Sequence, residues 1–362
     1  MMKQRDYNFG AGPAMLPSPV LEQINAELFD WRATGVSVME IGHRTVQFQE
    51  LLSNLLIKLK NLLNIPANYQ LVLTTGGAQG QFDAIPQNLC GIKRQVDYFI
   101  SGTWSKKAAL AAKKYADVNL VTEAGAHSIP DPRSWQLNPD AAYAYYCPNE
   151  TVAGIAFPDI PNVGKVPLIA DLTSSIASGP LDYSQFGIAF ASAQKNLGIA
   201  GVTLVIIRDD LLDQALASTP LVWNYKLMAE EKSSINTPPT FAIYVMDLMV
   251  DWMIAAGGIS ALGAINQHKV EKLYQYIDNS GGAYINDILP SYRSQLNVPF
   301  NLANNNMLTQ FLSEASAGGL RYLKGHISVG GARASLYNSM PESGVDKLIA
   351  FMQDFAARNF RK

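Results

Sequence analysis

The sequence contains few charged residues and very few cysteines. Charged side chains make up 16% of the 362 residues, against about 25% in an average globular protein, and the formal net charge is −2. Such a balance provides no basic surface for nucleic acid or an anionic membrane, so neither is expected as a partner. The two cysteines, Cys90 and Cys147, are too few for a disulfide scaffold or a cysteine metal cluster, which indicates a reducing, cytoplasmic compartment.

Targeting signals and long apolar runs are also missing. The first residues, MMKQRDYNFGAGPAMLP, lack the apolar core of a signal peptide, so secretion is not expected. The most membrane-like stretch, 240–256, is shorter than the roughly 20 residues that span a bilayer, and it contains Asp247 and Asp251. We predict that it forms a buried helix.

Several common site motifs are absent. The sequence contains no G-x-G-x-x-G, no P-loop and no H-E-x-x-H, and its four histidines show no ligand spacing. A dinucleotide fingerprint, a P-loop nucleotide site and a zinc protease are therefore excluded, and no metal is predicted.

Short apolar runs alternate with helical stretches along most of the chain. The expected strands are 70–75, 96–101, 142–147, 167–172, 187–193 and 201–208, and one expected helix is 105–115. This alternation predicts an α/β fold with a mostly parallel sheet covered on both faces. Two further helices, 260–278 and 344–359, suggest a smaller C-terminal unit. We predict a large domain, 18–263, and a small domain made of 1–17 and 264–362.

In a chain with so few charges, a solitary ionisable residue in apolar surroundings is informative. Lys195 is the only charged residue between Asp182 and Arg208, and it lies between two strands that are expected to be buried. Burial disfavours the cationic form of an amine and makes it a better nucleophile, as Schiff-base chemistry requires.

Two other isolated charges suggest ligand contacts. Asp171 lies at the carboxyl end of the expected strand 167–172, where the strands of an open α/β sheet face the ligand crevice. A purely structural helix cap is the alternative for this residue. Arg333 is the only full charge in VGGARASLYN, and an arginine held there suits bidentate capture of a carboxylate.

A glycine turn completes this set. In TTGGAQGQF, 74–82, a strand leads into Gly76-Gly77 and a helix, where backbone amides can approach a phosphate, although a plain turn uses glycines equally often. An isolated amine, an acid, a phosphate turn and a carboxylate-binding arginine together describe a pyridoxal-phosphate site. Ser192-x-x-Lys195 also matches the S-x-x-K of penicillin-recognising serine enzymes, but their S-D-N and K-T-G motifs are absent, so a Ser-Lys acyl enzyme is a minor alternative.

The chain resembles the phosphoserine aminotransferases, which are class V, fold-type I pyridoxal-phosphate enzymes. The resemblance extends over essentially the whole chain and rests on NFGAGPAMLP, SVMEIGHR, GGAQGQF, YCPNETVAGI, ASAQKNLGIAG, NTPPTF and GHISVGGARASLYN. It implies an aspartate-aminotransferase-like fold, with a large domain around a mostly parallel sheet and a smaller C-terminal α/β domain. It also implies transamination between glutamate and 3-phosphohydroxypyruvate, possible action in pyridoxine synthesis, and a homodimer with shared active sites.

The resemblance implies a role for each residue that matches a family motif. Lys195 would join pyridoxal 5′-phosphate covalently and move the proton, and Asp171 would pair with the ring nitrogen. The other implied cofactor contacts are Trp104 on the ring, the hydroxyl of Thr151, phosphate contacts from Ala78, Gln79 and Gln194, and Asn236 and Thr237 from the partner subunit. The implied substrate contacts are Arg333 at the α-carboxylate and His43, Arg44 and His326 around the substrate phosphate.

The chain departs from the family pattern at two positions near the expected substrate phosphate. Gln79 and Ile327 stand where relatives close to the enterobacterial enzyme carry arginine. A charge-assisted hydrogen bond contributes about 1.5–3 kcal/mol, so the loss of two would lower affinity by more than about a hundredfold. This leaves open a related fold-type I aminotransferase that acts on a keto acid without phosphate.

Overall fold

A seven-stranded sheet forms the centre of the computed structural model, which describes residues 5–360. Its strand order is β2-β10-β9-β8-β5-β3-β4. The strands are β2 (Tyr69–Thr75), β3 (Gln95–Ile100), β4 (Asp117–Glu123), β5 (Ala144–Tyr146), β8 (Leu168–Asp171), β9 (Ile188–Ser192) and β10 (Val202–Arg208). Strand β10 runs antiparallel to its neighbours β2 and β9, whereas the pairs from β9 to β4 are parallel. The predicted mostly parallel sheet is confirmed.

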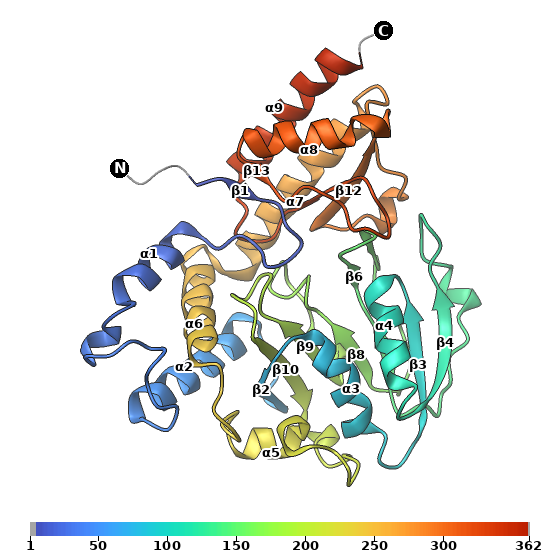
Figure 1. Ribbon diagram of the computed structural model, residues 1–362. Coiled ribbons are helices and arrows are strands. Elements are labelled where there is room, and N and C mark those ends of the chain that lie inside the picture. The colour runs from blue at the N-terminus through green and yellow to red at the C-terminus, as the bar shows by residue number, and fades with distance from the viewer. Residues whose placement is uncertain (1–4, 361–362) are drawn as a thin grey trace.

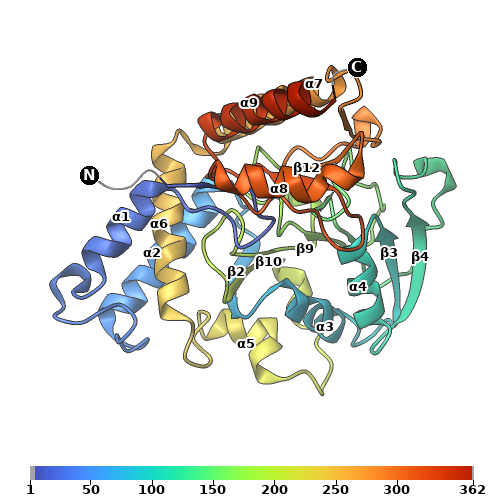
Figure 2. The ribbon, with the colours of Figure 1, turned by 45° about the horizontal axis from the view of Figure 1, so that its top comes forward.

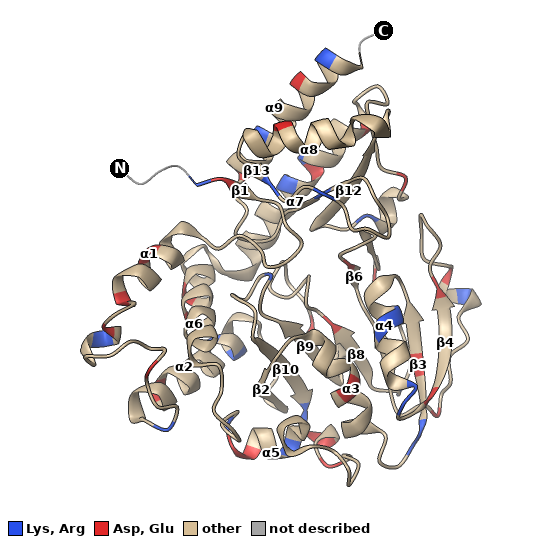
Figure 3. Cartoon of the chain, in the orientation of Figure 1, with Lys and Arg blue, Asp and Glu red and all other residues tan. Residues whose placement is uncertain are grey.

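Helices cover both faces of this sheet, as predicted (Figure 1). Along β10, Leu204 and Ile206 pack on one side with α2 (Val46–Leu62) and α6 (Thr240–Ala255), near α1 (Ser18–Glu27). Val205 and Ile207 pack on the other side with α3 (Ala78–Leu89), α4 (Thr103–Ala112) and α5 (Tyr225–Glu230). Because both faces are buried, the central strands β9 and β10 carry almost no charge (Figure 3).

Helix α6 corresponds to the apolar stretch 240–256, which is the most membrane-like part of the sequence. Nine of its residues are buried in the core, so the predicted buried helix is confirmed. Within residues 5–360 no single helix is long and apolar enough to cross a membrane, and α6 reaches that length only together with α7 (Gly258–Asp278), across a bend of 81°.

A second layer of helices and short strands lies above the large sheet (Figures 1 and 2). Strands β11 (Tyr284–Ile285), β12 (Asn297–Leu302) and β14 (Ala332–Ser335) form an antiparallel sheet that packs with α7, α8 (Leu308–Ala317) and α9 (Glu342–Asn359). The N-terminal strand β1 (Tyr7–Asn8) pairs with β13 (Leu320–Arg321), and Phe9 belongs to the same apolar cluster. Strand β14 brings Arg333 to the lower side of this layer, toward Thr151.

Lys269 of α7 anchors the segment that follows β14. Its buried amine donates to the carbonyls of Tyr337 at 3.0 Å and Met340 at 2.9 Å, and burial lowers its pKa to about 7. Between pH 7 and the ordinary value of 10.5, the unfolded chain therefore binds a proton that the folded chain lacks. Lys269 therefore contributes a stability that rises with pH across this window, by about 1 kcal/mol per pH unit.

We expect Lys269→Met to remove that slope. Urea unfolding at several pH values between 7 and 10 would show the free energy of unfolding rising less steeply in the variant than in the wild type. Lys165→Met, at an exposed position, is the matched control and should keep the wild-type slope. Parallel curves for wild type and Lys269→Met would contradict the prediction.

Candidate functional site

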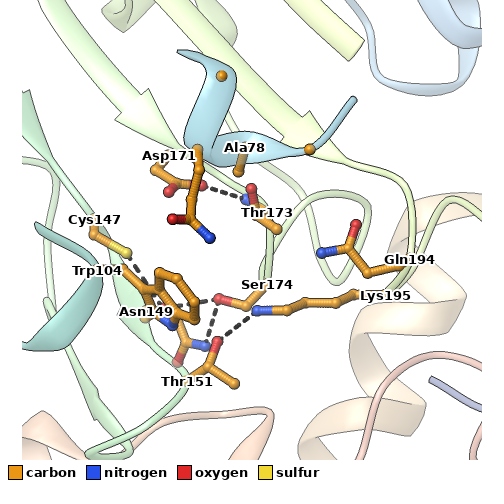
Figure 4. Close-up of a pocket in the computed structure, with 13 residues that line it drawn as sticks. Ala78, Trp104, Cys147, Asn149, Thr151, Asp171, Thr173, Ser174, Gln194 and Lys195 are labelled. Carbon is orange, nitrogen blue, oxygen red and sulfur yellow. Dashed lines mark hydrogen bonds between the residues drawn. The ribbon is translucent and has the colours of Figure 1, made fainter. Parts of the chain in front are cut away.

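A cavity of about 270 Å³ lies at the carboxyl ends of the parallel strands of the large sheet (Figure 4). Ligand crevices of open α/β sheets occur at this edge. Seven residues that the sequence predicted at a cofactor site line this one cavity: Ala78, Gln79, Trp104, Thr151, Asp171, Gln194 and Lys195.

Lys195 extends into the cavity from the turn after β9. Its amine is buried and donates to the hydroxyl of Thr151 at 2.7 Å (Figure 4). Gly12 packs against the aliphatic part of the side chain, where a Cβ would lie 3.4 Å from Lys195 Cγ. The hydroxyl of Ser192 donates to the side-chain oxygen of Gln194 and not to Lys195, so the structure gives no support to the Ser-Lys acyl enzyme.

Asp171 ends β8 and is buried on the side of the cavity where α3 begins. Its carboxylate accepts the backbone N–H of Thr173 at 3.0 Å and the hydroxyl of Tyr145 at 3.4 Å. Burial raises the pKa of this carboxyl, while these hydrogen bonds and the nearby Lys195 oppose the rise. The bond to Thr173 stabilises a turn and no helix begins there, so the structure gives no support to the alternative that Asp171 caps a helix.

The start of α3 provides a group of backbone donors. Gly76 has a φ of +105°, which favours glycine, and the N-cap residue Gly77 supplies no side-chain cap. The first amides of a helix lack partners within the helix, so those of Ala78 and its neighbours can face an anion in the cavity.

Arg333 approaches the same site from β14. One terminal nitrogen donates to the carbonyl of Thr151 at 3.2 Å, and Nε is buried without a hydrogen-bond partner among residues 5–360. Burial lowers the pKa of the guanidinium, because its charge is poorly compensated there. A carboxylate ligand would supply the missing partner.

Neither Arg333 nor the remaining predicted residues are among those that line this cavity. His326 is bonded to Ser328 in the loop before β14, and the Ile327 side chain next to it is 95% exposed. His43 and Arg44 lie in the segment before α2, and Asn236 and Thr237 lie in the segment before α6. Of these four residues, Arg44, Asn236 and Thr237 are exposed. Gln49 joins the two segments, because it donates both to the carbonyl of His43 at 2.6 Å and to the hydroxyl of Ser234 at 3.3 Å.

Several residues of the site were missed by the sequence reasoning. Asn149, Thr173 and Ser174 line the cavity, and Glu150 is fully buried beside it. Glu150 is the only charged residue between Asp140 and Asp159, so a fuller search for isolated charges would have found it. No such signal marks the other three residues.

Comparison with known proteins places this geometry in a family. The sequence profile of the aminotransferase class-V family matches residues 6–348. The chain belongs to this family. It is 48% identical to the phosphoserine aminotransferase of Hahella chejuensis, over 99% of this chain and all of that protein. It is 47% identical to that of Acinetobacter baumannii, over 98% of this chain and 99% of that one.

Solved structures of phosphoserine aminotransferases share the fold. The PLP-bound phosphoserine aminotransferase of Trichomonas vaginalis superposes with a TM-score of 0.93 and 39% identity, over 96% of this chain and 100% of that one. The phosphoserine aminotransferase of Bacillus circulans subsp. alkalophilus gives a TM-score of 0.95 and 37% identity, over 98% and 99%. The predicted fold-type I architecture is thereby confirmed.

The residues of this chain fit pyridoxal 5′-phosphate (PLP), the molecule bound in the Trichomonas relative. The cavity offers an amine for the aldehyde, an acid for the ring nitrogen and uncapped helix amides for the phosphate, from Lys195, Asp171 and the start of α3. The indole of Trp104 adds an apolar surface for the ring, and its buried Nε1 has no hydrogen-bond partner in the described part of the chain. Among residues 5–360, no group of three or more His, Cys, Asp or Glu could hold a metal ion.

Proposed function

We propose that this chain is a phosphoserine aminotransferase of serine biosynthesis that depends on pyridoxal 5′-phosphate. It would transfer the amino group of glutamate to 3-phosphohydroxypyruvate, giving 2-oxoglutarate and O-phospho-L-serine. The observation that carries this proposal is the gathering of Lys195, Asp171 and Trp104 around one cavity. The 48% identity to the Hahella chejuensis phosphoserine aminotransferase over nearly the full length supports 3-phosphohydroxypyruvate as the acceptor of the amino group.

Each residue has a distinct task in this reaction. When bound, the cofactor supplies an electron sink for the pair of electrons left at the substrate Cα. Lys195 Nζ, held by the Thr151 hydroxyl, would take the proton from the substrate Cα and deliver it to C4′ of the cofactor. Asp171 keeps the ring nitrogen protonated, and Arg333 orients the substrate through its α-carboxylate.

The acceptor without phosphate is not favoured. Its motivation was the absence of arginine at Gln79 and Ile327, but the curated relatives named phosphoserine aminotransferase match at 48% and 47% identity over nearly the whole chain. In the structure Ile327 does not line the cavity and its side chain points into solvent.

A comparison of half-reactions tests the proposed substrate. The holoenzyme would first be aminated with glutamate and then mixed with 3-phosphohydroxypyruvate or hydroxypyruvate, and the cofactor spectrum would be followed. We expect kcat/KM to favour the phosphorylated acid by at least about a hundredfold, because its phosphate adds charge-assisted hydrogen bonds. Equal values would instead favour the acceptor without phosphate.

The proposal includes a homodimer with shared sites. Arg44, Asn236 and Thr237 are exposed and lie outside the cavity of their own chain, yet Gln49 holds their two segments side by side. Such a surface suits delivery to the site of a second copy, where these residues and His43 would contact the phosphates of cofactor and substrate.

Three further expectations are part of the proposal. A large domain, 18–263, and a small domain, 1–17 with 264–362, agree with the separate apolar cluster that joins Phe9 to α7, α8 and α9. The free, buried cysteines Cys90 and Cys147 are compatible with a cytoplasmic protein. The same site could also act on 3-hydroxy-2-oxo-4-phosphonooxybutanoate in pyridoxine biosynthesis, because that substrate carries the same keto acid and phosphate groups.

A further inference from the structure

Glu150 is a buried carboxylate beside the site, and it has no role in the proposed reaction. It ends the short strand β6 (Asn149–Glu150), which pairs with β7 (Ile155–Ala156), and it directly precedes Thr151. Its exposed fraction is 0%. Burial raises the pKa of the carboxyl, while hydrogen bonds from Trp104 and Ser105 oppose the rise. A charge in such a place needs a structural or functional reason.

The partners of Glu150 all come from the first turn of α4. The backbone N–H of Trp104 lies 3.1 Å from each carboxylate oxygen. The backbone N–H and the hydroxyl of Ser105 donate to Oε1 at 2.8 Å and 2.7 Å. These amides have no partner within the helix, and the helix dipole favours a negative charge at this end. Glu150, which belongs to strand β6, therefore caps the N-terminus of α4.

The residue before the helix leaves room for this contact. A Cβ at Gly102 would lie 2.7 Å from the carboxyl carbon of Glu150, so a larger residue there would displace the carboxylate. The arrangement depends on both positions, although they are far apart in the sequence.

The cap connects two groups that face the cofactor cavity. Trp104 is the second residue of α4, so the amide that Glu150 binds belongs to the residue whose indole lines the cavity. On the other side, Thr151 follows Glu150 and holds the amine of Lys195 at 2.7 Å. We propose that Glu150 is a positioning residue. It fixes the indole of Trp104 relative to Lys195 and so determines the position of the space in which the cofactor ring binds. This inference rests on the proposed function.

Glu150→Gln tests the inference with little change in shape. The amide can accept through one oxygen only, and its NH₂ group would face the N–H donors of Trp104 or Ser105. Titration of the apoenzyme with pyridoxal phosphate, followed by absorbance, should give a Kd about 10- to 100-fold above wild type, since each hydrogen bond to a charged group contributes about 1.5–3 kcal/mol. The Kd for inorganic phosphate, whose proposed contacts include neither Trp104 nor Glu150, should stay unchanged. Equal weakening for both probes would overturn the inference.

Asp97→Asn is the matched control. Asp97 is another buried carboxylate that accepts two hydrogen bonds, from Asn119 and from the N–H of Asn138, and it lies outside the cavity. This control should lower thermal stability and leave the Kd for pyridoxal phosphate unchanged. An effect on Kd as large as that of Glu150→Gln would mean that any lost buried carboxylate loosens the site, and would refute a specific role for Glu150.

A double-mutant cycle separates positioning from general support. If Glu150 acts through the indole, Glu150→Gln should add less than about twofold to the Kd in a Trp104→Ala background, because contacting residues are not additive. Full additivity would refute the inference. Glu150→Asp keeps the charge with a shorter reach and should give an intermediate Kd, which provides the test if the glutamine variant does not fold. Failure of the wild type to bind pyridoxal phosphate would instead refute the proposed function.

Discussion

Replacement of Lys195 by alanine is expected to lower the rate of transamination by at least about 10³-fold. The amine reaches the cavity with a defined partner, the hydroxyl of Thr151, and proton transfer by a positioned base contributes about 10²- to 10⁴-fold by itself. The variant also loses the covalent attachment of the cofactor. Two measurements check this: the steady-state rate with glutamate and 3-phosphohydroxypyruvate, and the visible absorbance of the purified protein.

The control for this variant is a lysine on the surface. Lys165 is exposed and lies outside the cavity, so Lys165→Ala should keep wild-type kinetics and absorbance. Added methylamine should restore part of the activity of Lys195→Ala, because a small free amine can occupy the space of the missing side chain. Turnover at the wild-type rate without Lys195 would refute the proposed mechanism.

The same variant reports on the shared sites. A Lys195→Ala chain still carries intact Asn236 and Thr237, whereas a chain with Asn236→Ala and Thr237→Ala still carries intact Lys195. If a dimer combines residues from both chains at each site, random mixing should restore about a quarter of the wild-type activity. If each chain forms a complete site alone, mixing restores nothing.

The sequence predicted the core of the fold because burial leaves a strong pattern there. Strands β9 and β10 are apolar on both faces, and they lie within one residue of the predicted ranges. Strand β4 was missed, because it lies at the edge of the sheet and its residues DVNLVTE are mostly polar or partly exposed. An edge strand needs no continuous apolar run.

The site was predictable where a charge is buried in apolar surroundings. Lys195, Asp171 and Arg333 were selected in this way, and all three have exposed fractions below 10% in the structure. Trp104 and Thr151 were found only through the family resemblance, because a tryptophan or a threonine near a strand end is common in any core. Asn236 lies outside the cavity of its own chain, and no pattern within one chain can reveal what an exposed residue would contact on another.

Asp171→Asn is expected to slow the half-reaction with glutamate by about 10²- to 10³-fold, because removal of one partner from a buried ion pair costs about 3–5 kcal/mol. Asparagine can still accept the N–H of Thr173, so the turn after β8 should persist. What is lost is the negative charge that a protonated ring nitrogen requires, and without that proton the ring withdraws electrons from Cα less strongly.

Single-turnover measurement of the glutamate half-reaction separates this effect from substrate binding. The rate constant at saturating glutamate should fall, while the glutamate concentration that gives half of this rate changes little. Asp182→Asn is the matched control, since Asp182 caps a turn in the same way, through the N–H of Ser184, and is exposed outside the cavity. Its rate should stay within about twofold of wild type, as surface substitutions usually change free energies by less than 0.5 kcal/mol. Reconstitution of Asp171→Asn with a cofactor methylated at the ring nitrogen, which carries a permanent positive charge, should recover much of the lost rate. If Asp171→Asn alone retains the wild-type rate, the carboxylate has only the structural role of closing its turn, and the electron sink must be maintained without it.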